Sequence, residues 1–254
     1  MKKLTFLALA LAVVMTTGNF VAVAETIPSP LANKIIALDA GHDDVAYGAS
    51  NIIGGVLVTE AEVNWDVVVA LESKLTAQGA KVVIAGRYST RRDRVNDAVA
   101  KCAAVDVAGD GTADNKKCDV LVSVHHNGIT DNPTHDGTLT IYTQKSDKPL
   151  AQSLLTALTP LTGDSEGMLN GGYGMTVYKN LVSAITEAYY ITNDCEAELY
   201  LYSKNQLTDI QVSPQCKTGV YILENRIERE ADLQVAGLSN YFDSQSSGGG
   251  GKPR

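Results

Sequence analysis

The sequence has little positive charge: 21 lysines and arginines stand against 29 aspartates and glutamates, which gives a formal net charge of −8 at pH 7. An acidic surface repels phosphate backbones and anionic lipids, so we expect no nucleic acid partner and no binding to an anionic membrane surface. The chain also lacks a GxGxxG motif or a phosphate-binding loop ahead of a helix. Nucleotide chemistry therefore has no support.

Long apolar runs are absent after the first two dozen residues. Those residues read MKKLTFLALALAVVMTTGNFVAVA, with Lys2 and Lys3 first, then an apolar run, then Ala22-Val23-Ala24. The run is too short to cross a bilayer, and its small-residue end fits signal peptidase. We predict a signal peptide over residues 1–24, no membrane insertion, and export to the periplasm or the extracellular cell-wall space. A retained N-terminal anchor is the alternative.

Cysteine is scarce as well, and the four cysteines (Cys102, Cys118, Cys195 and Cys216) form no CxxC pair. Zinc–cysteine and redox chemistry therefore have little support. An even number of cysteines in an exported chain predicts two disulfides. Three pairings are possible from the sequence. We favour Cys102–Cys118 with Cys195–Cys216, because each of these pairs would close a loop-like segment.

The domain organisation follows from composition. Residues 25–33 are rich in Pro and Ser and predict a linker, and the Ser/Gly-rich residues 243–254 predict a disordered tail. One domain is left at residues 34–242, with an acidic insertion at about 105–118. The segment 106–119 resembles a calcium loop, but Ala108 and Lys117 occupy ligand positions. A solvated loop closed by a disulfide is the favoured interpretation.

Apolar runs alternate with helical patterns through this domain. We predict strands at Lys34–Leu38, Lys81–Ala85, Asp119–Val124, Thr138–Thr143 and Ser183–Tyr190, and helices at 60–78, 90–105, 147–160 and 225–242. The Gly-rich residues 161–175 predict a flexible loop beside the groove. This alternation predicts a three-layer α/β/α fold around a central mostly parallel or mixed sheet.

Histidine is scarce too, with only His42, His125, His126 and His135. His42 and His125 directly follow predicted strands, and Glu187 lies in a late strand. Ligands bind at the carboxyl ends of such strands, so we expect these three side chains at one sheet edge. Two imidazoles and one carboxylate suit a catalytic zinc ion, and a further carboxylate can move protons. His135, in a polar loop, is expected to be solvated.

Four segments in order strengthen this hypothesis. The segments are KIIALDAGHDDVAYGA, EAEVNWDVVVALESKLTAQGAKVVIAGR, DVLVSVHHNG and VSAITEAYYITN. Together they resemble the zinc-dependent N-acetylmuramoyl-L-alanine amidases of the third amidase family over about residues 34–242. The resemblance implies hydrolysis of the amide between N-acetylmuramic acid and L-alanine in peptidoglycan, which would be the partner, with one Zn²⁺ per chain.

The resemblance also implies residue roles. His42 matches the first zinc histidine, Glu60 the zinc glutamate four residues before Asn64, and His125 the second zinc histidine. Glu187 matches the catalytic glutamate, followed at the family's spacing by Tyr190 and Asn193.

Several alternatives stay open. Glu62 is the rival of Glu60 if the helix register is wrong, and a salt bridge to Arg94 is the structural alternative for Glu187. His125 and His126 alternate along a strand, so only one can face a metal.

The sequence departs from the family where Asp43 and Asp44 follow His42, a place usually held by glycines. Asp43, His126 and Asn127 are candidate substrate contacts. The departure also keeps two other hypotheses open: a catalytically degenerate cell-wall binding or activator protein, and a zinc amidase or peptidase for another amide. Since no wall-binding repeat is visible, a regulatory protein is a conceivable partner.

Overall fold

The computed structural model describes residues 28–248. A six-stranded sheet in the order β4-β1-β5-β8-β6-β7 forms its centre. Every neighbouring pair is parallel except β6 and β8, which run antiparallel. The strands are β1 (Ile35–Ala40), β4 (Lys81–Ile84), β5 (Val120–Asn127), β6 (Thr138–Tyr142), β7 (Ser165–Asn170) and β8 (Ser183–Tyr190). The predicted mixed sheet is confirmed.

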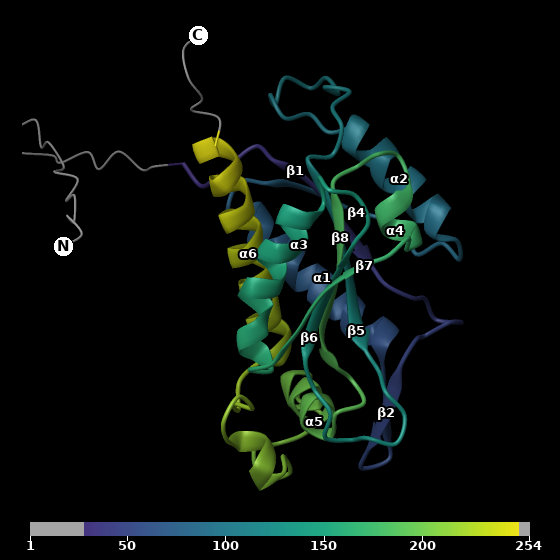
Figure 1. Cartoon of the computed structure of the whole chain (residues 1–254), viewed down its shortest axis with the longest axis vertical. Helices are drawn as coiled ribbons and strands as arrows, with labels where there is room; N and C mark the ends of the chain where they lie inside the picture. The colour runs from purple at the N-terminus through teal and green to yellow at the C-terminus, as the bar shows by residue number, and fades with distance from the viewer. Residues whose placement is uncertain (1–27, 249–254) are drawn as a thin grey trace, which may run out of the picture.

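Helices cover both faces of this sheet, so the predicted three layers are present (Figure 1). On one face lie α1 (Glu60–Ala77), α3 (Lys148–Leu158) and α6 (Arg226–Gly248), and on the other lie α2 (Arg91–Ala103) and the short α4 (Gly174–Val177). Helix α5 (Asp194–Ser203) follows β8, and single 3₁₀ turns lie at Thr159–Leu161 and Pro214–Lys217. Figure 1 shows α3 and α6 side by side.

The alternation of side chains along β1 explains why the core has two halves. Ile36 and Leu38 pack toward α1 and α6, whereas Ile35 and Ala37 pack toward α2. All six residues of β1 are buried, as expected for a strand inside a parallel sheet. The burial of this strand holds the loop that follows it, which starts with Gly41 and His42, at the carboxyl edge of the sheet.

Several elements were not predicted, namely strands β2 (Ser50–Ile53), β3 (Val56–Thr59) and β7 and helices α4 and α5. Strands β2 and β3 form an antiparallel hairpin around Gly54-Gly55, both with positive φ. This hairpin leads directly into α1. Strand β7 lies in the segment predicted to be a flexible loop. The segment is ordered because it pairs with β6 at the sheet edge. The prediction that residues 161–175 are flexible is therefore wrong for residues 165–170.

The domain borders also differ from the prediction. Leu31, which lies in the predicted linker, is fully buried in the main core. At the other end, α6 continues to Gly248 rather than ending at 242, so the predicted disordered tail starts too early. The predicted signal peptide lies outside the described residues, as do 249–254. None of the helices in residues 28–248 is long and apolar enough to span a bilayer.

Both favoured disulfides are confirmed, as Cys102–Cys118 and Cys195–Cys216. The first one joins the end of α2 to the start of β5 and closes the acidic loop between them. Within that loop the carboxylate of Asp106 accepts hydrogen bonds from the backbone amides of Gly109, Asp110 and Gly111. The carboxylate of Asp106 thus stabilises the conformation of this loop.

Candidate metal centre

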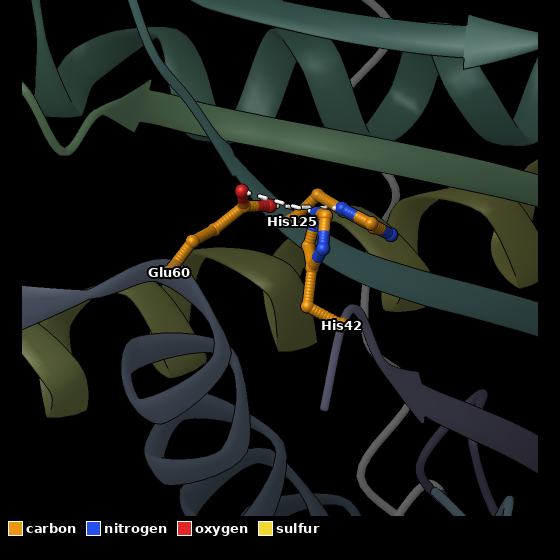
Figure 2. A group of neighbouring side chains, drawn as sticks. All are labelled: His42, Glu60 and His125. Atoms are coloured by element: carbon orange, nitrogen blue, oxygen red, sulfur yellow. Dashed lines mark hydrogen bonds and ion pairs between the residues drawn. The ribbon is translucent and has the colours of Figure 1, made fainter. Parts of the chain in front are cut away.

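The two histidines and the glutamate from three separate segments meet at the sheet edge. Ligand atoms of His42, Glu60 and His125 all lie within 4.8 Å of one another. His42 stands in the loop after β1, Glu60 opens α1, and His125 lies near the end of β5 (Figure 2). The Nε2 atom of His42 is 3.1 Å from Oε2 of Glu60, and Nδ1 of His125 is 2.9 Å from Oε1. Each imidazole therefore faces a different oxygen of one carboxylate.

The loop after β1 holds His42 in a conformation that few side chains adopt. His42 has φ of 65°, in the left-handed region, which costs energy for a residue with a Cβ. Its Nδ1 lies 3.0 Å from the carbonyl of Ala46, and this contact turns the opposite ring nitrogen toward Glu60. Arg94 donates to the carbonyl oxygens of Ala40 (2.8 Å) and His42 (2.6 Å). The strain is therefore offset by bonds from a buried guanidinium.

Two glycines leave the space that the cluster occupies. A Cβ on Gly41 would collide with the ring of His125, and a Cβ on Gly48 would collide with Oε2 of Glu60. Gly48 also has φ of 75°. The sequence marks Gly41 through its place before His42, whereas nothing in the sequence singles out Gly48. Both positions require glycine because the loop wraps closely around the three clustered side chains.

The electrostatics of the cluster follow from these contacts. Burial raises the pKa of Glu60, but the hydrogen bonds and charges of His125 and His42 outweigh it and hold this pKa well below its usual range. The hydrogen bond to Glu60 is the main reason that the pKa of His42 is raised above its ordinary 6.5, against the opposing effect of burial. The carboxylate of Glu60 and the imidazole of His42 thus stabilise each other's charged forms.

Glu187 lies beside the cluster. It pairs with His125 in the register of β8 and β5, so both side chains point to the same face of the sheet. Among residues 28–248, no hydrogen bond or ion pair joins Glu187 to another side chain, and Arg94 bonds elsewhere. The predicted alternative of an Arg94–Glu187 salt bridge is therefore wrong. Burial, and then the negative charge of Glu60, raise the pKa of Glu187 well above its usual range.

Of the three candidate substrate contacts, two line hollows beside the cluster and the third points away from it. Asp43 and Asn127 each line a hollow beside the cluster. The side chain of His126 is fully buried and points to the other face of the sheet, where Nδ1 lies 2.7 Å from Asn64 and Nε2 2.8 Å from Glu230. Strand alternation places it there. His126 as a substrate contact is therefore wrong.

Asn64 connects this buried group to the metal centre. Its amide donates to the carbonyl of Gly41 at 3.0 Å and approaches Oε1 of Glu60 at 3.5 Å. Beyond His126, Gln234 donates to the other oxygen of Glu230 at 2.9 Å. A hydrogen-bonded chain thus runs from α6 to Glu60. Spacing points to Asn64, one helical turn after Glu60, but no local pattern points to Glu230.

Three other polar residues singled out in the sequence, Asp43, Asp44 and His135, form contacts within the fold. Asp43 accepts from the amides of Val45 and Ala46 in its own loop, and Asp44 pairs with Arg87 at 3.0 Å. His135 is half-buried, with Nε2 3.0 Å from Glu166, so it is not simply solvated.

The family's later motif positions have structural roles. Asn193 caps α5 by accepting from the amides of Cys195 and Glu196. The hydroxyl of Tyr190 donates to Glu166.

Sequence comparison agrees with this geometry. The family model for N-acetylmuramoyl-L-alanine amidases matches residues 36–211. The chain belongs to this family. It is 28% identical over 195 residues to N-acetylmuramoyl-L-alanine amidase LytC of Bacillus subtilis strain 168, an alignment that covers 72% of this chain and 35% of LytC. The chain thus spans about a third of the length of that curated relative.

Solved structures of family members share the fold. The catalytic domain of CwlV, an amidase from Bacillus (Paenibacillus) polymyxa var. colistinus, superposes with a TM-score of 0.60 at 22% identity, covering 83% of this chain and 98% of CwlV. An N-acetylmuramoyl-L-alanine amidase from Clostridium difficile 630 gives a TM-score of 0.61 at 20% identity, covering 85% of this chain and 99% of that chain. Nearly the entire length of each domain is therefore matched in fold.

Proposed function

We propose that this chain is a zinc-dependent hydrolase that cleaves the amide between N-acetylmuramic acid and L-alanine in peptidoglycan. One observation carries the proposal: His42, Glu60 and His125 converge within 4.8 Å, and Glu187 lies next to His125 on the neighbouring strand. Family membership supplies the substrate class. The two hollows that His42 and His125 line supply access for a polymer.

The residues present fit a zinc ion. Two imidazole nitrogens and one carboxylate are the ligand set that catalytic zinc sites use when a further position stays open. The loop wraps closely around these side chains, since a Cβ on Gly41 would collide with His125 and a Cβ on Gly48 would collide with Glu60. When bound, zinc supplies Lewis acidity, which activates water and polarises a carbonyl. His42, Glu60 and His125 would hold it.

Glu187 supplies the proton transfer in this proposal. Its carboxylate accepts a proton from the attacking water and then donates it to the leaving nitrogen of L-alanine. A raised pKa suits this role, since the carboxylate is a stronger base when burial and the charge of Glu60 disfavour its ionised form. Within residues 28–248 Glu187 has no ion-pair partner, so it is available to water and substrate.

The test is digestion of purified sacculi by the zinc-loaded chain. We expect released peptides that begin with a free L-alanine amine and intact glycan strands, with no release after chelation. Glu187→Gln should lower the rate by about a hundredfold or more while the zinc content stays at one per chain. Full activity of Glu187→Gln would remove Glu187 from the mechanism. Zinc binding without hydrolysis by the wild-type chain would favour the degenerate binding protein, and cleavage of a different bond would favour another amide substrate.

The setting of this activity is part of the proposal. The signal-peptide pattern of residues 1–24, the two disulfides and the family's cell-wall substrate all fit an exported protein in the periplasm or the extracellular cell-wall space. A regulatory partner also fits, since the CwlD amidase from Clostridioides difficile, which shares this fold with a TM-score of 0.56, has been solved in complex with the GerS lipoprotein.

A further inference from the structure

Two hollows of different character meet at the metal centre. Both are lined by His42 and His125. One has a volume of about 910 Å³ and extends along the start of α2, where Arg91 and Arg92 line it. The other, of about 490 Å³, is lined beyond the cluster and Glu187 by neutral groups, among them Ser50 and Thr130. We call the first the arginine hollow and the second the neutral hollow.

The acids that line the arginine hollow already have partners. Asp39 is buried and accepts from Ser123 at 2.7 Å. Asp43 is bonded to its own loop, and Asp93 accepts from the hydroxyl of Thr90 at 2.6 Å. The printed ion pairs of Asp39 and Asp43 are with Arg94, and among the described residues none of these three carboxylates forms an ion pair with Arg91 or Arg92.

Arg91 and Arg92 form no ion pair with any of residues 28–248, although acids outnumber basic residues in this chain. Each is nevertheless positioned by the α4 segment. The guanidinium of Arg92 lies 5.4 Å from the centroid of the Tyr178 ring, and the aliphatic part of Arg91 fills the space that a Cβ on Gly174 would need. Stacking on an aromatic ring orients a guanidinium without neutralising it.

We propose that Arg91 and Arg92 bind free carboxylates of the substrate's stem peptide, and that the peptide therefore lies in the arginine hollow while the uncharged sugar lies in the neutral hollow. This inference rests on the proposed function and adds the direction in which the substrate crosses the metal centre. Guanidinium groups bind carboxylates with charge-assisted, often paired hydrogen bonds. The proposed ligand class is thus an anionic peptide, linked through its amino end to a neutral saccharide.

The experiment compares two soluble muramoyl tripeptides that differ only in whether the peptide carboxyl groups are free or amidated. With wild-type, zinc-loaded chain we expect a KM about tenfold lower for the free acid, the size of one charge-assisted hydrogen bond. The double variant Arg91→Gln/Arg92→Gln should raise KM for the free acid about tenfold, with kcat little changed and no effect on the amidated substrate. The matched control is Lys148→Gln, an exposed cation at the start of α3, which covers the other face of the sheet; it should change neither.

Equal KM values of the wild type for the two substrates, or equal losses on both in the double variant, would overturn the subsite. Failure of the proposed function would look different, because the wild type would then hydrolyse neither tripeptide. In that case calorimetric titration of the free-acid tripeptide still decides: binding that weakens about tenfold in the double variant supports the arginine subsite, and unchanged binding rejects it.

Discussion

The Nε2 atom of His126 lies 2.8 Å from Oε2 of Glu230, 104 residues further along the chain, and both side chains are completely buried. The pair connects α6 to β5 across the core. Through Asn64 it also reaches Glu60 and the carbonyl of Gly41. Packing at a distance from the candidate metal centre therefore helps to position Glu60.

Removal of either partner should destabilise the fold. Glu230→Ala leaves a buried imidazole nitrogen without its partner, so we expect the free energy of unfolding to fall by about 3 kcal/mol. Urea denaturation of Glu230→Ala, His126→Ala and the double variant measures the coupling between them. The double variant should lose less than the sum of the single variants, and strict additivity would show that the two side chains do not act together.

Substitution of Gly48 should damage the metal centre itself. Gly48→Ala introduces a Cβ that collides with Oε2 of Glu60, so zinc affinity should fall at least tenfold. Gly54→Ala is the matched control, because Gly54 also has a positive φ but has open space around it. Both variants carry the cost of about 1–2 kcal/mol for a left-handed residue with a Cβ. Equal zinc affinities in the two variants would contradict the role assigned to Gly48.

Removal of a histidine from the cluster should weaken zinc binding, whereas removal of a histidine elsewhere should not. His42→Ala and His125→Ala remove a ligand each and should bind less than one zinc ion per ten chains at a zinc concentration that fills about nine in ten wild-type sites, which corresponds to about hundredfold or greater weakening. His135→Ala, whose imidazole contacts Glu166 away from the cluster, should keep full occupancy. Metal analysis after dialysis gives the result, and full zinc in His42→Ala would mean that another side chain is the ligand.

The metal-free protein should depend on pH in a defined way. The pKa of His42 is raised, so its contribution to stability is complete below its ordinary 6.5 and is lost as pH rises through the raised value. The pKa of Glu60 is lowered, so its contribution is complete above its ordinary 4.5 and is lost as pH falls further. Stability from this cluster should therefore be greatest between those limits.

The contribution of His42 to the stability of the metal-free protein decreases as pH rises, whereas the zinc affinity should increase, because a protonated imidazole cannot be a ligand. Zinc affinity should rise with pH until His42 is neutral, by about tenfold per pH unit where one proton is displaced. Titrations at several pH values with and without zinc measure both curves. A zinc affinity that does not change between pH 5.5 and 7.5 would contradict the link.

The features of this structure that the sequence predicts are those that depend on local sequence patterns. The alternation of apolar runs with helical segments predicted the three layers. The positions of His42 and His125 after predicted strands, now β1 and β5, predicted that the two side chains lie at the same edge of the sheet. The resemblance selected Glu60 and Glu187 from many acids. Glu62, the rival to Glu60, lies elsewhere on the helix and pairs with Lys204 at 3.9 Å.

The unpredicted part depends on contacts between distant segments. Nothing near Glu230 indicates that it lies against His126, and Gly48 becomes restricted only once Glu60 lies beside it. The polar composition around β7 indicated a loop, but pairing with β6 overrides local preference. Leu31 was assigned to a linker because its neighbours are Pro and Ser, yet its single apolar side chain finds a place in the core.

The position of α6 affects where this protein can be shortened. The family match ends at residue 211, whereas α6 begins at Arg226. A chain trimmed to the matched residues would expose the apolar faces of α1 and α3 to water and remove Glu230 from His126. Expression of the minimal family segment should therefore yield aggregation or a poorly folded product, and any fragment intended for crystallisation or engineering has to keep the last helix.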